Sequence, residues 1–357
     1  MQPISGDDTR DDLPALAPPQ GENPDDSATL RDLNRQFPQF AIWREVMPGR
    51  TRYAAQRIGS GHGLHSVITA DVGEMRAVLA QARREQALAP ARLPAGPAQP
   101  NIARRYSYFL GGTDHQPADR LAAESVTVHH REVTGVARAN RAFVLRAVTH
   151  AATLGITQFV DLGAGLPEPP TVHQTARTVN PAARTAYVDN DPVVLDRARA
   201  KLATTGGVAV VDADLRDPET VLASRALRAV IDLDRPVCVL AASVLHFLPP
   251  SHADDLMETV TAATAPGSYL AVSVGTATGT DPDLLSRLRC AYAGTTLVTA
   301  RTEDEIMGWF TGLDLLPPGL VDVRDWRPGH ATLRSRWGPR PAARFLAALA
   351  RKPPPAL

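Results

Sequence analysis

From residue 156 onward, short apolar runs alternate with longer segments in which apolar residues recur at helical spacing. The first pattern indicates buried strands and the second indicates helices with one apolar face. Such an alternation is typical of a parallel sheet covered by helices on both faces. The predicted strands are Gln158–Asp161, Thr185–Asp189, Val208–Val211, Val237–Ala242 and Tyr269–Val274. The predicted helices are Val172–Val179, Pro192–Leu202, Pro218–Val230, His252–Ala265, Pro282–Tyr292 and Thr302–Phe310.

The flanking segments follow different patterns. Residues 101–150 are predicted to be mainly helical, with one long helix over His129–His150. Leu315–Val323 is a candidate sixth strand, and Ala342–Ala350 fits a helix or a strand equally well. The chain from 101 to 357 is therefore expected to be one doubly wound α/β domain with a helical segment at its start.

The N-terminal part has another character. Residues 1–27 are rich in Pro, Asp, Gly and Ser, and we expect them to be disordered. Residues 28–86 predict a small α+β module of a helix, three strands and a second helix capped by Asp71. Residues 87–100 form a proline-rich linker.

The most informative motif is the glycine turn after the strand that begins at Gln158. Asp161 closes the strand, and Gly163 and Gly165 allow the backbone to turn sharply against a ligand. A capping box of Thr171 and Gln174 then starts a helix.

The same turn argues against a dinucleotide. The third glycine of a dinucleotide fingerprint is replaced here by Glu168, and Pro167 precedes it. Proline has no N–H group to offer a pyrophosphate at the helix start. A ligand without phosphates, such as S-adenosylmethionine, fits this turn better.

Candidate cofactor residues follow three further strands. Asp189 ends the second strand, where a carboxylate can accept hydrogen bonds from ribose hydroxyls. Asp191 precedes Pro192 and is predicted to cap the next helix instead. Asp214 follows the third strand and can accept from an adenine amino group, with Leu215 against the ring.

The fourth strand is followed by Ser243 and His246. Ser243 is interpreted as structural, because no glycine elbow surrounds it and no Asp partner for a hydrolase triad is evident. It is also a candidate cofactor-binding residue because it directly follows the fourth strand. His246 is the candidate general base, and the alternative is that it hydrogen-bonds a backbone group beside the crevice.

The helical segment 101–150 carries an unusual polar set. We expect it to form a lid over cofactor and substrate, with a glycine hinge, and a solvated helical cap is the alternative. The lid residues are Tyr106, Gly111, Gly112, Asp114, Asn140 and Arg141.

Composition excludes several other classes. The formal net charge is zero, which gives no general attraction to nucleic acid. No apolar run is long enough to predict a membrane span, and the acidic start does not predict a signal peptide. Cys238 and Cys290 indicate reduced thiols of a cytoplasmic protein, and no metal site is expected.

These landmarks together resemble a bacterial family of S-adenosylmethionine-dependent methyltransferases whose substrates are largely undefined. The matching stretches are residues 105–114, 137–143, 159–167, 187–195, 212–218, 244–248, 265–270 and 326–328. The resemblance implies a class I methyltransferase sheet whose last, antiparallel strand is Ala342–Ala350. The family commonly has an acid at Ser107, a lysine at Thr113 and an asparagine at His115, so this chain departs from it within the lid.

The sequence thus predicts an S-adenosylmethionine-dependent methyltransferase acting on a small-molecule acceptor. Two alternatives stay open: a non-catalytic S-adenosylmethionine sensor whose N-terminal module binds a protein, and a nicotinamide-dependent oxidoreductase. Methyl transfer from a sulfonium depends mainly on alignment, so a base is needed only if the acceptor must lose a proton.

Overall fold

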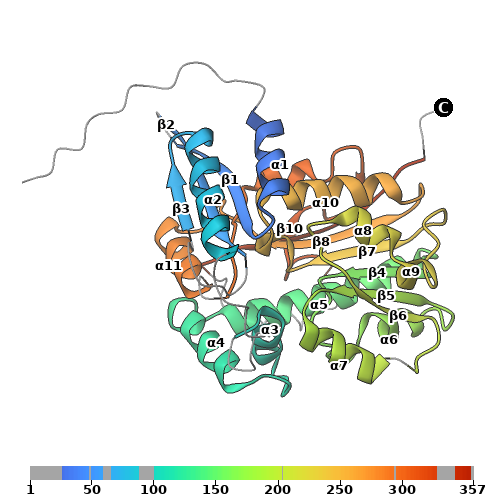
Figure 1. Ribbon diagram of the computed structural model, residues 1–357. Helices are drawn as coiled ribbons and strands as arrows, with labels where there is room; N and C mark the ends of the chain where they lie inside the picture. The colour runs from blue at the N-terminus through green and yellow to red at the C-terminus, as the bar shows by residue number, and fades with distance from the viewer. Residues whose placement is uncertain are drawn as a thin grey trace, which may run out of the picture. The chain divides into compact units, whose positions relative to one another are not determined.

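The computed structural model of the chain describes residues 26–47, 50–58, 66–87, 100–202, 204–292, 295–327 and 342–354. The chain divides into two compact units (Figure 1). One unit comprises residues 1–56 and 63–88, and the other comprises residues 57–62 and 89–357. Most of the predicted disordered N-terminus and of the predicted linker lies outside the described residues.

The smaller unit is the predicted α+β module. Its elements are α1 (Asp26–Gln36), β1 (Phe40–Met47), β2 (Arg50–Arg57), β3 (Ser66–Thr69) and α2 (Val72–Ala87). The strands form one sheet in the order β1-β2-β3, with β2 and β3 antiparallel. The helices pack Leu33 and Leu79 against Phe40 and Tyr53 of the sheet. Asp71 caps α2 through the N–H group of Glu74, as predicted.

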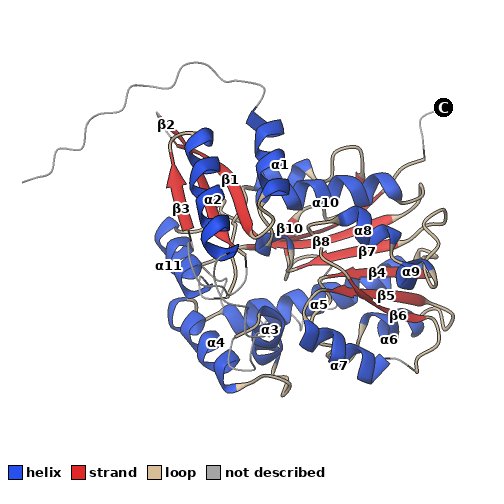
Figure 2. Cartoon of the chain, viewed as in Figure 1, coloured by secondary structure: helices blue, strands red, loops and turns tan. Residues whose placement is uncertain are grey.

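The larger unit is built on a mostly parallel sheet (Figure 2). Its strands are β4 (Gln158–Leu162), β5 (Arg184–Asp189), β6 (Val208–Asp212), β7 (Cys238–Ala242), β8 (Tyr269–Gly275), β9 (Asp314–Leu315), β10 (Val321–Asp322) and β11 (Phe345–Arg351). Their order is β10-β11-β8-β7-β4-β5-β6, and β9 also pairs with β11. Strands β4 to β8 are parallel, and β11 runs antiparallel to β8. The doubly wound architecture expected from the sequence is therefore present.

Successive residues of the strands enter two separate cores. Phe159 belongs to the core under one face of the sheet and Val160 to the core under the other, because strand side chains alternate. The first core is covered by α5 (Val133–Thr153), α6 (Val172–Arg177) and α7 (Pro192–Leu202). The second is covered by α8 (Pro218–Ala223), α9 (Arg225–Arg228), α10 (Pro250–Ala263) and α12 (Glu303–Gly308). Both faces are buried, which explains why the strands read as continuous apolar runs.

The strand order places the predicted ligand crevice. The chain leaves β4 for β5 and β6 on one side and then returns to β7 and β8 on the other. In a doubly wound sheet, ligands bind where the order reverses, at the carboxyl ends of the strands. Here that point lies between the ends of β4 and β7.

Several element boundaries differ from the sequence prediction, three of them with a clear physical reason. Leu315–Val323 is not one strand: Pro317 and Pro318 lie between the two short strands β9 and β10, since proline cannot donate to a sheet. The helix predicted over Pro218–Val230 breaks at Ser224, whose backbone is extended. The long helix begins at Val133, after α4 (Pro117–His129) has ended. The ambiguous segment Ala342–Ala350 contains β11 and pairs with β8 as the resemblance implied.

The helical lid has a small core of its own. It is formed by α3 (Ile102–Leu110), α4, the start of α5 and α11 (Pro282–Tyr292). Phe109, Val126 and Ala137 are buried together, and Leu288 of α11 packs against them. The membership of α11 was not expected, because its sequence pattern only predicts another sheet-covering helix.

A buried ion pair holds the lid helices together. Asp119 is fully buried and accepts from Arg104 Nε at 2.7 Å. The same carboxylate accepts from the backbone N–H groups of Asn101 and Gln116. One side chain thus fixes the starts of both α3 and α4.

We expect Asp119→Ala to lower the free energy of unfolding by about 3–5 kcal/mol, because it removes the carboxylate that forms a buried ion pair with Arg104. Urea unfolding followed by circular dichroism measures this loss. The matched control is Glu124→Ala on the same helix, whose exposed pair with Arg120 should contribute at most about 1 kcal/mol. Equal effects of the two substitutions would contradict the structural role assigned to Asp119.

Candidate active site

The two glycines of the turn after β4 have backbone conformations that other residues rarely adopt. Gly163 has φ of 66° and Gly165 has φ of 64°. The N–H groups of Gly163 and Ala164 both donate to Val188 O of the neighbouring strand. A Cβ at Gly163 would overlap the side chain of Val244, which follows β7. The turn therefore needs glycine both for its shape and for the close approach of the β7 loop.

Asp189 binds this turn directly. Its Oδ2 accepts from Gly165 N at 2.9 Å, while its Oδ1 accepts from the N–H groups of Asn190 and Asp191. Burial raises the pKa of the Asp189 carboxyl, although these three bonds oppose the shift. The Asp189 carboxylate thus organises two loops, the glycine turn and the loop that leads to α7.

The neighbouring carboxylate has the structural role predicted for it. Asp191 Oδ1 accepts from Val193 N and Val194 N and so caps α7. Its other oxygen accepts from Asn101 Nδ2 at 2.5 Å, which ties the start of the lid to the same helix.

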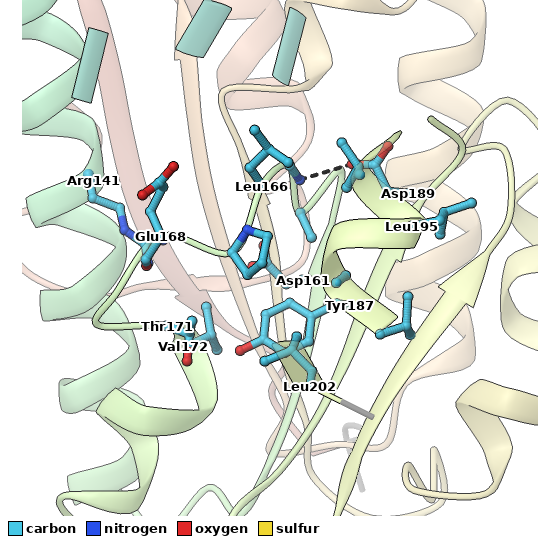
Figure 3. Close-up of a pocket in the computed structure, with 16 residues that line it drawn as sticks. Arg141, Asp161, Leu166, Glu168, Thr171, Val172, Tyr187, Asp189, Leu195 and Leu202 are labelled. Atoms are coloured by element: carbon cyan, nitrogen blue, oxygen red, sulfur yellow. Dashed lines mark hydrogen bonds between the residues drawn. The ribbon is translucent and has the colours of Figure 1, made fainter. Parts of the chain in front are cut away.

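A pocket lies beside the glycine turn (Figure 3). It contains about 380 Å³ of empty space, open to solvent. Its wall carries four charged side chains, namely Arg141, Asp161, Glu168 and Asp189. The remaining lining residues are Ala164, Gly165, Leu166, Pro167, Thr171, Val172, Tyr187, Val194, Leu195, Ala198, Leu202 and Val210. An apolar pocket with a few converging polar groups is the usual form of a cofactor site.

Asp161 is the most perturbed acid of the pocket. It is only 7% exposed, and none of the described residues donates a hydrogen bond to its carboxyl group. Burial raises its pKa to about 7, with Arg141 opposing the shift and Asp189 adding to it. A buried carboxyl group without a partner has the character of a ligand-binding group.

Arg141 and Glu168 lie together on the lid side of the pocket. Arg141 Nη2 donates to Glu168 O at 2.8 Å and to Pro170 O at 2.5 Å. Glu168 Oε1 accepts from Ser107 Oγ of α3 at 2.5 Å. The family commonly has an acid at position 107, and here a carboxylate reaches the same place from the glycine turn.

Tyr106 and Asn140 join the lid to the sheet. Asn140 Nδ2 donates to Tyr106 Oη at 2.8 Å, and Ser273 Oγ of β8 donates to Asn140 Oδ1 at 2.5 Å. Tyr106 Oη donates in turn to Ala137 O. Burial raises the pKa of Tyr106 to about 12, so this hydroxyl stays protonated as a donor. Neither residue lines the pocket.

The remaining lid candidates have structural partners. Gly111 has φ of 89° and ends α3 in the left-handed conformation. Its observed structural role is therefore that of a helix cap, while the hinge stays a prediction. A Cβ at Gly112 would overlap Ser107 Oγ and Glu168 Oε1. The Asp114 carboxylate binds Lys201 Nζ of α7 at 2.9 Å, and this bond lowers the pKa of Asp114.

Asp214 and Leu215 are not part of the pocket. Asp214 forms a two-pronged ion pair with Arg216; burial alone would raise its pKa, but the Arg216 contacts lower it. Leu215 is buried in the core under the second face of the sheet. The structure does not bring either residue to the lining described above.

Ser243 and His246 lie at the adjacent end of β7. Ser243 has φ of 58°, and its N–H donates to Ser273 O. His246 is buried between the rings of Phe247 and Phe345, and burial lowers its pKa to about 4. Its Nδ1 is buried and has no partner among the described residues, so the predicted alternative of a backbone hydrogen bond is not seen at that atom.

The described residues offer neither a metal cluster nor a membrane-spanning helix. They contain no group of three or more His, Cys, Asp or Glu side chains placed to hold a metal ion. None of their helices is long and apolar enough to cross a membrane.

Sequence reasoning missed part of this site. In the sequence, Glu168 stands out only because it replaces the third glycine of a dinucleotide fingerprint. A charged side chain next to a ligand-binding turn is itself an indication of a ligand-binding role. Ser107 was noted only as a departure from the family. Tyr187 and Leu195 line the pocket because of how β5 and α7 pack, which no local motif reveals.

Comparisons with known proteins agree with this geometry. A family model described as S-adenosyl methyltransferase matches residues 89–353. A methyltransferase structure from Thermobifida fusca, its assignment provisional, is 36% identical, with a TM-score of 0.65 over 72% of this chain and 96% of that one. A DUF574 family protein from Streptomyces avermitilis is 37% identical, with a TM-score of 0.67 over 71% of this chain and 98% of that one.

Curated sequences give the same result over shorter stretches. A Mycobacterium avium protein, provisionally assigned as an S-adenosyl-L-methionine-dependent methyltransferase, is 31% identical over 161 residues. These residues are 44% of this chain and 50% of that protein, so the match spans about half the length of this curated relative. The family match covers well over half of the chain, and on that basis the chain belongs to the S-adenosyl methyltransferase family.

Proposed function

We propose that this protein transfers the methyl group of S-adenosylmethionine to a small-molecule acceptor. The observation that carries the proposal is the pocket beside the glycine turn, at the carboxyl ends of β4 and β5, which Asp161, Gly165 and Asp189 line. Asp161 is buried in that pocket without a partner, which suits a ligand that brings its own hydrogen-bond donors or positive charge.

Residues of the pocket would hold the ribose and the positively charged part of the cofactor. Asp189, at the end of β5, would accept from a ribose hydroxyl with the one lone-pair site, on Oδ2, that its three backbone bonds leave free. Asp161 would face the positively charged part, and Gly163 and Gly165 would let the backbone lie close to it. When bound, S-adenosylmethionine supplies an electrophilic methyl group on a sulfonium.

The protein's own contribution would be alignment and exclusion of water. The lid is tied to α7 by the bond from Asn101 to Asp191 and by the ion pair between Asp114 and Lys201. Holding two reactants in line can account for much of the acceleration of a displacement reaction. His246, with a pKa near 4, is neutral at pH 7 and a weak base, so it would serve acceptors that need little help in losing a proton.

Two alternatives remain distinguishable by experiment. A sensor would bind S-adenosylmethionine without turning it over, and an oxidoreductase would exchange hydride with a nicotinamide cofactor. The oxidoreductase is disfavoured because Pro167 and Glu168 occupy the turn where a pyrophosphate needs free N–H groups.

The proposal also covers the cellular location and the partners of the protein. We expect a cytoplasmic bacterial enzyme that binds neither nucleic acid nor membranes, whose N-terminal module serves a protein partner. The module contributes no residue to the pocket lining, so we expect cofactor binding to need only residues 101–357.

The first test is cofactor choice. S-adenosylmethionine and S-adenosylhomocysteine should raise the melting temperature, because a ligand that binds only the folded state stabilises it by mass action. NAD should not raise it. Incubation with methyl-labelled S-adenosylmethionine and cell extract should give labelled small molecules and S-adenosylhomocysteine. A shift with NAD alone would refute the proposal, and binding without any label transfer would favour the sensor.

The second test separates Asp189 from Asp191. Asp189→Ala should weaken S-adenosylhomocysteine binding about tenfold to a hundredfold, the effect of losing hydrogen bonds to a charged group. Asp191→Ala should cost about 1 kcal/mol of stability through loss of the α7 cap and change affinity little. Calorimetric titration with melting curves measures both properties. If Asp191→Ala lost more affinity than Asp189→Ala, the ribose assignment would be wrong.

The third test is pH dependence. Because the pKa of Asp161 is raised to about 7, the folded protein without ligand holds more protons than the unfolded chain between about pH 4 and pH 7. Its free energy of unfolding therefore falls as pH rises through that window. The sulfonium charge of the ligand favours ionised Asp161, so S-adenosylmethionine affinity should rise about tenfold from about pH 5.5 to about pH 7.5.

Asp161→Asn is the control for this test. It should bind S-adenosylmethionine more weakly and with little dependence on pH, since the titrating group is gone. The α-ammonium of the ligand stays protonated below about pH 8, so it does not mask the effect. An unchanged pH profile in Asp161→Asn would show that another group titrates.

A further inference from the structure

The end of the pocket opposite Asp189 carries two opposite charges, Arg141 and Glu168. No role has been assigned to Glu168. Figure 3 shows Arg141 and Glu168 together on one side of the pocket and Asp189 on the other side. Both side chains of the pair line the pocket. The pair comes from different elements, since Arg141 lies on α5 and Glu168 lies in the turn that follows β4.

Glu168 is held so that half of its carboxylate stays available. Ser107 Oγ donates to Oε1 at 2.5 Å, and Gly112 lies beside this contact because it has no Cβ. No group in the described part of the chain donates to Oε2. One oxygen is therefore fixed by the lid, and the other can accept from a ligand in the pocket.

Arg141 is fixed in a similar way. Its Nη2 donates to the backbone oxygens of Glu168 and Pro170, on the loop that carries Glu168. Its Nε and Nη1 have no acceptor among the residues that the structure describes. A guanidinium has five N–H groups, so donors remain for a carboxylate on a ligand.

A third group indicates that this wall faces a charged ligand. Asp161 is 93% buried, it lines the same pocket, and no described residue donates to it. Three carboxyl groups and one guanidinium therefore converge on the pocket, with two of the carboxyl groups only partly satisfied or unsatisfied. An excess of acceptors suits a ligand that carries positive charge.

We infer that Glu168 binds the α-ammonium group of the amino-acid end of S-adenosylmethionine, while Arg141 binds the carboxylate of that same end. This inference rests on the proposed function. If Asp189 holds the ribose at one end of the pocket, the zwitterionic end of the ligand extends to the other end, where an anion and a cation lie side by side. Two opposite charges fixed on one wall match a zwitterion and select against ligands that lack it.

Ser107 and Gly112 are then positioning residues. Ser107 fixes one oxygen of Glu168, and any side chain at Gly112 would push that carboxylate away. The backbone of Gly112 does not have positive φ, so Gly112→Ala is free of backbone strain. The overlap would involve the ends of two flexible side chains, so the substitution should move Glu168 without unfolding the lid.

The experiment titrates the full-length protein with S-adenosylmethionine, S-adenosylhomocysteine and 5′-methylthioadenosine by calorimetry. The third ligand keeps the nucleoside but lacks the amino-acid end. Glu168→Gln should weaken the first two ligands about tenfold to a hundredfold and leave the third within about twofold. Ser107→Ala and Gly112→Ala should act in the same direction by smaller factors. Glu124→Gln, on the exposed face of α4, should change none of the three affinities.

Several results would overturn the assignment. Equal loss of all three ligands in Glu168→Gln would mean that Glu168 shapes the pocket only. Loss of S-adenosylmethionine alone would assign Glu168 to the sulfonium, which the other two ligands lack. No loss in any variant would remove Glu168 from the site. If the wild-type protein bound none of the ligands, the proposed function itself would fail, and this inference with it. If Glu168→Gln did not fold, the same comparison would be made with Gly112→Ala.

Discussion

The carboxylate of Asp189 and the glycine turn after β4 form the interaction on which the site depends. The backbone can form this turn because Gly163 and Gly165 adopt positive φ. Hydrogen bonds then hold the turn in place: Asp189 accepts from Gly165 N, and Val188 O accepts two further N–H groups. The same carboxylate orders the loop that leads to α7. A single half-buried acid thus joins the carboxyl ends of β4 and β5, where each would otherwise leave unpaired backbone donors.

This arrangement carries an electrostatic cost. Asp161, Asp189 and Glu168 converge on one pocket with Arg141 as the only cation in its lining. Burial raises the pKa of Asp161 to about 7 and also raises the pKa of Asp189. Functional sites commonly retain such strain, because a ligand of the opposite charge relieves it on binding. The excess of carboxyl groups in the pocket therefore favours binding of a cationic group.

Polar contacts around the pocket tie the first lid helices to the rest of the domain. Ser107 reaches Glu168, Asn101 reaches Asp191, and Asn140 links Tyr106 to Ser273. The lid's own apolar core is small and includes α11. Polar contacts of this kind can be exchanged for contacts with water more readily than a packed apolar core.

Local pattern determined most of the fold and the general kind of site. The alternation of apolar runs and helical faces predicted the sheet, and the caps at Thr171 and Asp191 form as expected because they are governed by neighbouring residues. The glycine turn could also be predicted from the sequence, because its conformation depends on neighbouring residues. The resemblance to methyltransferases added the antiparallel place of β11, which periodicity alone left ambiguous.

Tertiary structure decided what each polar side chain touches. Asp214 pairs with Arg216 and Leu215 enters the core, although both follow a strand at the expected place. Glu168 and Ser107 meet across 61 positions of sequence, and α11 joins a lid that begins 180 residues before it. Sequence spacing specifies contacts along one helix or strand, but contacts between elements depend on how the layers pack, and that is set by the whole core at once.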